Sequence, residues 1–438
     1  MDFYVLKDLA RSVSRNKAKQ IEVLGNPGAR KSRSLKLYEA ILSDKFNSEK
    51  ELVRHVFNTH DPKHPSYVKL KKKLITQLFN TSLFLDYNQP HYNERAKAYF
   101  TAYKDYASAF VVLCRISTKA AIYIFQNILE QAIKYEFIDL AADVSKILRR
   151  EYIRSEYDEG KNKYYTSLHR MYEKKRHFEN IALDYYEEVA SHYAKSRSVN
   201  IKLSEEADQY YSELYPFLKE VDTSSFYYYT FNICIIKHFS KNDISNALKT
   251  ANQSFYILRE RQNTNRSMLT HVCLQQLACY IHLRAEESTF HFTFNYFLDH
   301  SHDKDISWFR GYESYFYYSI YRKKYIDAID IYRTVLDNGV LLKLNGYYLE
   351  NWLLMAGYLH LLAQLDILDS QKVLDVVGLF RYSKLINEVE VINKDKEGMN
   401  IPLLLLPILY ELAQAPQRPH QRNSHRSARQ IPPALARQ

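Results

Sequence analysis

The chain has 438 residues, of which 46% are hydrophobic and 25% are charged, a composition typical of a globular protein with a sizeable core. Only nine residues are glycine, whereas phosphate-binding loops and strained nucleophile turns need glycine at several positions. The composition therefore favours helices and argues against glycine-dependent active sites. The 39 tyrosines are expected mainly to pack between helices, with their hydroxyls reaching a polar rim.

The net charge of +11 is concentrated at the two ends of the chain. Residues 1–85 carry a net charge of +9 and residues 416–438 carry +5, whereas residues 86–415 carry −3. We therefore expect any affinity for a polyanion to lie in the ends and not in the long central part.

Apolar residues at helical spacing predict short helices over residues 2–13, 35–42, 48–57 and 67–85. Ser48 and Glu51 are spaced as a capping box at the start of the third of these. Residues 1–85 are thus predicted to form a small basic helical region, and a helix-turn-helix reader of DNA is one interpretation. A solvated charged face is the other. The candidate polyanion contacts are Arg30, Lys31, Arg33, Lys69, Lys71, Lys72 and Lys73.

A loop within this basic region resembles a phosphate-binding P-loop in spacing, because Gly25, Lys31 and Ser32 match three of its positions. Arg30, however, stands where the second glycine would let backbone N–H groups turn toward the phosphates. We expect a basic loop between helices and no bound nucleotide cofactor.

The four cysteines lie in apolar helical stretches and do not form a metal-ligand pair. They are expected to be reduced core residues in a reducing compartment. The first residues lack the apolar stretch of a signal peptide, and no window is apolar over the length of a membrane span. We therefore expect a cytoplasmic protein without a membrane partner. Two turns with histidines and acids are expected to be polar loops and not metal sites: His60, Asp61 and His64, and His300, His302, Asp303 and Asp305.

From residue 93 onward the apolar pattern predicts helices in pairs. Aromatic or aliphatic residues that open second helices are separated by 41, 66 and 81 residues, which fits one or two hairpins of about 40 residues each. The predicted helices span 96–114, 118–135, 137–152, 161–173, 174–193, 204–221, 224–240, 243–259, 267–284, 288–300, 306–322 and 325–338.

Residues 312–338 form the clearest hairpin pattern of the chain. Tyr325 opens the second helix, Ala328 allows close helix approach, and Tyr332 follows one turn later. This pattern resembles a tetratricopeptide (TPR) repeat. The resemblance implies an all-α protein in which residues 93–413 form a TPR-like α-solenoid, because each hairpin needs its neighbour to cover its exposed face.

The end of the chain changes character. Further helices are predicted over 340–363, 371–382, 385–391 and 400–412, the last of them apolar nearly all round. Residues 414–438 are rich in Arg, Pro and Gln and read as a disordered tail. One hypothesis is that this tail comes from a frameshift or a fusion, and the other is that it is a basic arm for polyanions.

No catalytic motif occurs in the sequence, so we expect a non-enzymatic scaffold or adaptor that binds a protein or peptide partner on the solenoid. A nucleic-acid-associated regulator that uses residues 1–85 is the alternative. Tyrosines beyond those needed for packing would contact the partner. The candidates, each of which could instead belong to the core, are Tyr227, Tyr228, Tyr229, Tyr315 and Tyr318.

Overall fold

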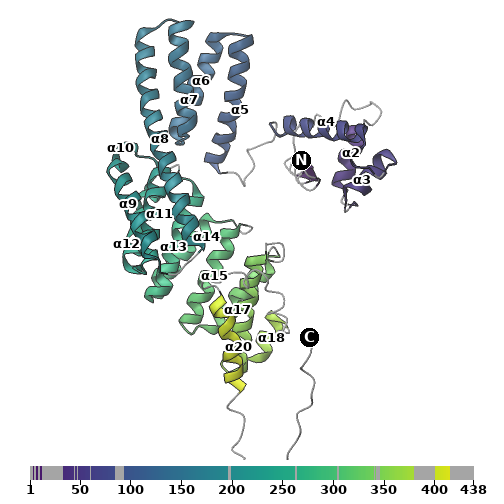
Figure 1. Ribbon diagram of the computed structural model, residues 1–438, viewed down its shortest axis with the longest axis vertical. Coiled ribbons are helices and arrows are strands. Elements are labelled where there is room, and N and C mark those ends of the chain that lie inside the picture. Colours follow the sequence, from purple (N-terminus) through teal and green to yellow (C-terminus); the bar gives the residue numbers. More distant parts are fainter. Residues whose placement is uncertain are drawn as a thin grey trace, which may run out of the picture. The chain divides into compact units, whose positions relative to one another are not determined.

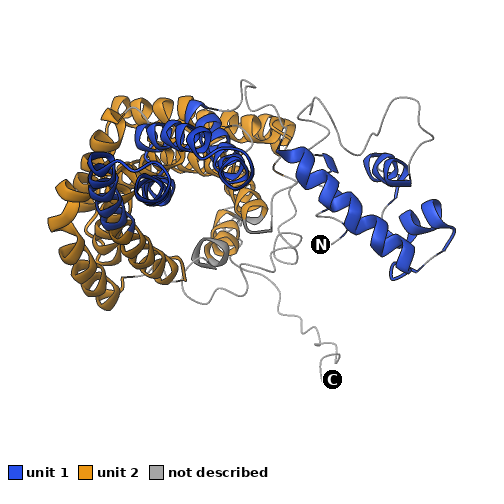
Figure 2. Ribbon diagram, turned by 90° about the horizontal axis from the view of Figure 1, so that it is seen from above, with its two compact units in different colours: residues 1–176 blue, residues 177–438 orange. Residues whose placement is uncertain are grey.

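The computed structural model describes residues 3, 6–7, 10–11, 33–43, 45–46, 48–59, 61–83, 93–195, 199–261, 264–302, 305–339, 341, 346–378 and 400–414. Within these residues every regular element is a helix, so the all-α prediction is confirmed. The chain divides into two compact units, residues 1–176 and 177–438, which Figure 2 colours separately.

The N-terminal helices of unit 1 share one small hydrophobic core. Helices α2 (Arg33–Leu42), α3 (Glu49–Phe57) and α4 (Pro65–Ser82) pack around fully buried leucines, and Phe3 and Leu6 join the same cluster. The predicted cap at α3 is confirmed, because the Ser48 hydroxyl accepts a hydrogen bond from the Glu51 backbone N–H.

The rest of unit 1 is built from long helices, shown at the top of Figure 1. Neighbouring helices in the chain pack together through alanines and branched aliphatic side chains, α5 against α6 and α6 against α7. The elements are α5 (Glu94–Arg115), α6 (Thr118–Lys134), α7 (Ile138–Arg154) and α8 (Glu159–Lys195), of which α8 continues past residue 176 into unit 2.

Two predicted boundaries are wrong. The helices expected over 161–173 and 174–193 are one continuous helix, α8, because the segment between them contains no glycine or proline that would end a helix. Conversely, the helix expected over 204–221 is interrupted. Tyr215–Phe217 form a short 3₁₀ turn (η2) around Pro216, whose missing N–H removes an intrahelical hydrogen bond.

Unit 2 continues as a series of helices, and from α10 to α16 each helix packs on the next. In addition, α11 contacts α9, and α13 contacts α15. The helices follow a curved course in Figure 2. Their bounds are α9 (Ile201–Leu214), α10 (Leu218–Val221), α11 (Ser224–Ser240), α12 (Ile244–Glu260), α13 (Arg266–Leu283), α14 (Glu287–His300), α15 (Ile306–Tyr321) and α16 (Tyr325–Asp337).

One type of turn recurs between paired helices. In each case a residue with positive φ follows the first helix, and the next backbone N–H donates to the carbonyl five residues earlier, at 2.8 to 3.0 Å. This is the Schellman arrangement that ends helices. The positive-φ residue of this turn is Glu136 in unit 1 and Asn242, Arg284, Lys323 and Asp366 in unit 2. The four in unit 2 recur at intervals of 42, 39 and 43 residues, close to the hairpin length of about 40 predicted from the sequence.

Small residues follow three of these turns at the same position. Ala141, Ala247 and Ala328 each lie four residues after the end of a turn, and each is fully buried. Because a larger side chain would separate the two helices of a hairpin, this confirms the role that was predicted for Ala328.

The last described helices are α17 (Gly346–Gln364), α18 (Ser370–Val377) and α20 (Asn400–Gln414). Leu406 of α20 is buried against α17, and the Tyr410 hydroxyl donates to the Gly357 carbonyl at 3.1 Å. The helix predicted over 385–391 and the tail from residue 415 lie outside the described residues. None of the described helices has the length and apolar character required to span a membrane.

Candidate partner-binding surface

The three consecutive tyrosines of α11 point in different directions, because successive residues of a helix are rotated by about 100°. All three are partly buried. The Arg261 guanidinium lies over the Tyr227 ring, with the guanidinium carbon 5.0 Å from the ring centroid. Arg261 also pairs with Asp222. Tyr228 and Tyr229 instead face α8. The structure therefore separates Tyr227 from the other two.

Tyr228 and Tyr229 form an aromatic group with Tyr186 of α8. The ring centroid of Tyr186 lies 6.0 Å from that of Tyr228 and 5.6 Å from that of Tyr229. Burial raises the pKa of Tyr228, and the neighbouring Tyr186 raises it further. The Tyr228 hydroxyl therefore stays protonated and acts as a hydrogen-bonding group, not as a phenolate.

His271 of α13 extends this group. Its Nδ1 lies 2.8 Å from the Tyr228 hydroxyl oxygen. Burial lowers the pKa of His271 to about 4, and the positive charge of Arg310 on α15 lowers it in the same direction. The imidazole is thus neutral at pH 7, so the contact is a hydrogen bond between two uncharged side chains.

Arg310 is exposed at the end of this series, with its guanidinium carbon 5.9 Å from the ring centroid of Tyr348 on α17. The charge of Arg310 lowers the pKa of His271. Burial raises the pKa of Tyr186, and the charge of Arg310 opposes this rise. We call the five residues Tyr186, Tyr228, Tyr229, His271 and Arg310 the tyrosine–histidine row.

A second layer of polar contacts lies one helical turn further along the same helices. The Gln275 side-chain amide of α13 donates to the Asn232 oxygen of α11 at 2.6 Å, and the Asn232 amide donates to the Tyr228 carbonyl at 2.7 Å. The side-chain oxygen of Gln275 is buried, and no described residue donates a hydrogen bond to it. Such a buried acceptor is costly to leave unpaired.

Polar contacts also link α15 to α17. The Asn351 amide donates to the Glu313 carboxylate, and the Tyr317 hydroxyl donates to the Asn351 oxygen at 3.3 Å. Side-chain hydrogen bonds thus join α11 to α13 and α15 to α17, and α13 packs against α15. This arrangement offers hydrogen-bonding groups, aromatic faces and one exposed cation to a ligand.

Tyr315 and Tyr318 do not belong to the tyrosine–histidine row. Both rings pack against Phe290 of α14, with centroid distances of 5.7 and 3.9 Å. Tyr318 is 1% exposed and its hydroxyl donates to the Ala285 carbonyl. The prediction that Tyr318 is a surface contact for a partner is therefore wrong, and the alternative prediction, that its ring belongs to the core, is confirmed. Tyr315 is partly buried at the same helix contact.

The predicted polyanion contacts on α4 differ in their surroundings. Lys69, Lys72 and Lys73 are exposed. Lys71 is partly buried and pairs with the Glu49 carboxylate at 2.6 Å, and the Tyr67 hydroxyl donates to the same oxygen at 2.7 Å. Arg33 is exposed at the start of α2, whereas Arg30 and Lys31, with the rest of the P-loop-like segment, lie outside the described residues.

The remaining sequence candidates show no grouping. Within the described residues no three His, Cys, Asp or Glu side chains are placed to hold a metal ion, and His60 and Asp303 are outside them. The four cysteines are free thiols. Three of them are buried as expected, but Cys114 is exposed. The core prediction is therefore wrong for Cys114, which lies on an outward face of α5.

Tyr186, His271 and Arg310 were not anticipated from the sequence. His271 and Gln275 do stand out in retrospect, because they are polar residues four apart on an otherwise apolar stretch of α13. Comparisons with protein-family profiles, curated proteins and solved structures find no match for this chain.

Proposed function

We propose that this protein is a non-catalytic scaffold or adaptor that binds a protein partner on the surface of a TPR-like α-solenoid. Two observations support the solenoid: one Schellman turn recurs at intervals near 40 residues, and from α10 to α16 each helix packs on the next. We also propose a cytoplasmic location, which is supported by cysteines that are all free thiols.

The observation that carries the binding function is the tyrosine–histidine row. Partner-binding surfaces are enriched in Tyr and Arg, which give large contact areas at a low cost in side-chain entropy. Here three tyrosines, a neutral histidine and an exposed arginine from α8, α11, α13 and α15 act together. The protonated Tyr228 hydroxyl and the neutral His271 imidazole are suited to hydrogen bonding with a partner.

The test is a pull-down from native cell extract with the full-length protein, at low and high salt, with and without nuclease. Tyr229→Ala and Arg310→Gln should each lower recovery of a specific protein partner about tenfold, a typical effect of removing a central interface residue. Tyr256→Ala on α12 and Arg333→Gln on α16 make the same chemical changes at exposed positions away from the row, and they should leave recovery unchanged.

Equal recovery with all four variants would contradict binding at the row. The alternative function, a nucleic-acid-associated regulator, is favoured by the three exposed lysines of α4, Lys69, Lys72 and Lys73. It predicts that only material sensitive to nuclease and salt is recovered, because phosphate contacts weaken steeply with ionic strength.

A further inference from the structure

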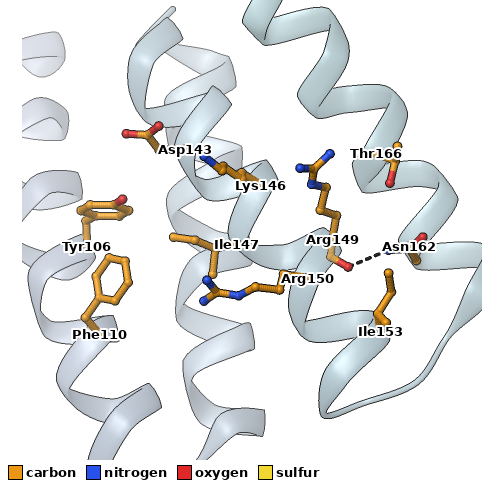
Figure 3. Close-up of a pocket in the computed structure, with 10 residues that line it drawn as sticks. All are labelled: Tyr106, Phe110, Asp143, Lys146, Ile147, Arg149, Arg150, Ile153, Asn162 and Thr166. Carbon is orange, nitrogen blue, oxygen red and sulfur yellow. Dashed lines mark hydrogen bonds between the residues drawn. The ribbon is translucent and has the colours of Figure 1, made fainter.

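A pocket of about 560 Å³ lies on the surface of unit 1 (Figure 3). Helix α7 forms its floor, and α5 and α8 form its two sides. This size is within the range of ligand-binding pockets. The residues that line it are Tyr106, Phe110, Asp143, Lys146, Ile147, Arg149, Arg150, Ile153, Asn162 and Thr166.

Apolar groups lie on two sides of the pocket. On α5, the rings of Tyr106 and Phe110 meet edge to face with centroids 5.1 Å apart. Ile147 is buried in the floor, whereas Ile153 is 60% exposed toward the other side. An occupant could therefore bury aliphatic or aromatic side chains against both sides.

The charges of the pocket are predominantly positive. Its acid, Asp143, accepts from Arg176 at 3.1 Å, and Arg150 pairs through Nε with Glu151 at 3.0 Å. Lys146 and Arg149 have no ion pair with a described residue. Arg149 is partly buried, and its carbonyl accepts a hydrogen bond from the Asn162 amide at 2.6 Å, drawn as the dashed line in Figure 3.

A buried histidine next to the pocket responds to this excess of positive charge. His169 of α8 is 8% exposed, with Nδ1 3.1 Å from the Ala142 carbonyl oxygen. Burial lowers the pKa of His169 most, the hydrogen bond to the Ala142 carbonyl and the charge of Glu173 raise it, and Arg149 and Lys146 lower it. The two cations thus act on the region independently of any ligand.

The shape of the pocket restricts its occupant. Along α7 the lining residues extend from Asp143 to Ile153, which at 1.5 Å per residue is about 15 Å. An extended peptide rises about 3.3 Å per residue, so four or five residues would cover this length.

From these charges and dimensions we propose that the α5–α7–α8 pocket binds an acidic peptide segment of a partner protein, with Lys146 and Arg149 contacting its carboxylates and the apolar sides holding its aliphatic or aromatic residues. This site is separate from the tyrosine–histidine row, so an experiment can contradict one of the two binding proposals without contradicting the other.

The test is fluorescence anisotropy with the full-length protein and a fluorescein-labelled peptide of alternating glutamate and phenylalanine. Lys146→Gln combined with Arg149→Gln should weaken binding about tenfold, because two charge-assisted contacts are lost. Arg170→Gln removes an exposed cation on α8 that does not line the pocket, and it should leave the Kd unchanged. Ile153→Ser should weaken binding a few-fold through lost apolar contact.

Three results would overturn the proposal: no saturable binding of the peptide, equal weakening by Arg170→Gln, or equal binding of a glutamate–glycine peptide that lacks apolar side chains. The second would show diffuse attraction by surface charge, and the third would show that the apolar sides have no part. Circular dichroism of each variant confirms that the helices are retained.

Discussion

At Gly311 the backbone of α15 lies directly against the fully buried ring of Phe297 on α14. A Cβ atom at this position would lie 2.1 Å from the nearest ring carbon, well inside van der Waals contact. Glycine is therefore required here by close helix approach and not by backbone conformation.

We expect Gly311→Ala to lower the free energy of unfolding by about 1–2 kcal/mol, because overpacking outweighs the better helix propensity of alanine. Urea unfolding followed by circular dichroism measures this. Gly160→Ala is the matched control, since its Cβ would meet its nearest neighbour at an ordinary 3.4 Å. An unchanged stability of Gly311→Ala would show that α14 and α15 can separate without cost.

His271 is expected to make stability depend on pH. Its pKa in the folded protein is about 4, below the value of about 6.5 in an unfolded chain. Below pH 6.5 the unfolded chain therefore binds a proton that the folded protein does not, and the free energy of unfolding falls as the pH falls toward 4.

Between pH 7 and pH 5, wild-type protein should lose up to about 2 kcal/mol more stability than the His271→Gln variant, which cannot titrate there. Urea unfolding of both proteins at the two pH values measures the difference. Parallel losses in the two proteins would mean that His271 is already protonated in the folded state or reaches solvent freely.

At the scale of elements, the recurring turn is built without glycine. Lys323 has φ 59°, in the left-handed region that costs a residue with a Cβ about 1 kcal/mol. The two Schellman hydrogen bonds, from Lys323 N–H to the Ile320 carbonyl and from Lys324 N–H to the Ser319 carbonyl, hold it there.

Lys323→Gly should therefore raise the free energy of unfolding by up to about 1 kcal/mol, since the strain is removed. Arg322→Gly, one residue earlier at an unstrained φ of −79°, should lower it by about 0.5–1 kcal/mol through the entropy of the unfolded chain. Thermal unfolding compares the stabilities of the two variants, and we expect Lys323→Gly to be the more stable one. The reverse ordering would contradict a strained turn.

Element boundaries show which sequence signals were reliable. The bounds of α11 (Ser224–Ser240) were predicted correctly, because Thr223 caps its start and the turn at residues 241–243 ends it. The continuity of α8 was missed, since a helix was predicted to end at residue 173 and another to begin at 174, although this segment lacks glycine and proline. Charge alone does not end a helix; backbone chemistry does.

At the scale of the whole molecule, unit 1 and unit 2 differ in the side-chain chemistry of their proposed sites. The pocket of unit 1 combines apolar sides with two cations, Lys146 and Arg149, that form no ion pair with a described residue. The tyrosine–histidine row of unit 2 combines aromatic rings with a neutral histidine. The division at residue 176 differs from the sequence-based one, which separated residues 1–85 from 93–413. Within unit 1, however, α2 to α4 and α5 to α8 bury separate hydrophobic clusters.

The sequence by itself determined the all-α class, most helix positions and the hairpin length, because helical periodicity, caps and turn residues act within a few positions of the chain. It also proposed Tyr228 and Tyr229 as candidate contacts for a partner. Only the tertiary structure brought Tyr186, His271 and Arg310 to them and placed Tyr318 in the core. The reason is that each side chain's burial and partners depend on how separate helices pack, which no local pattern specifies.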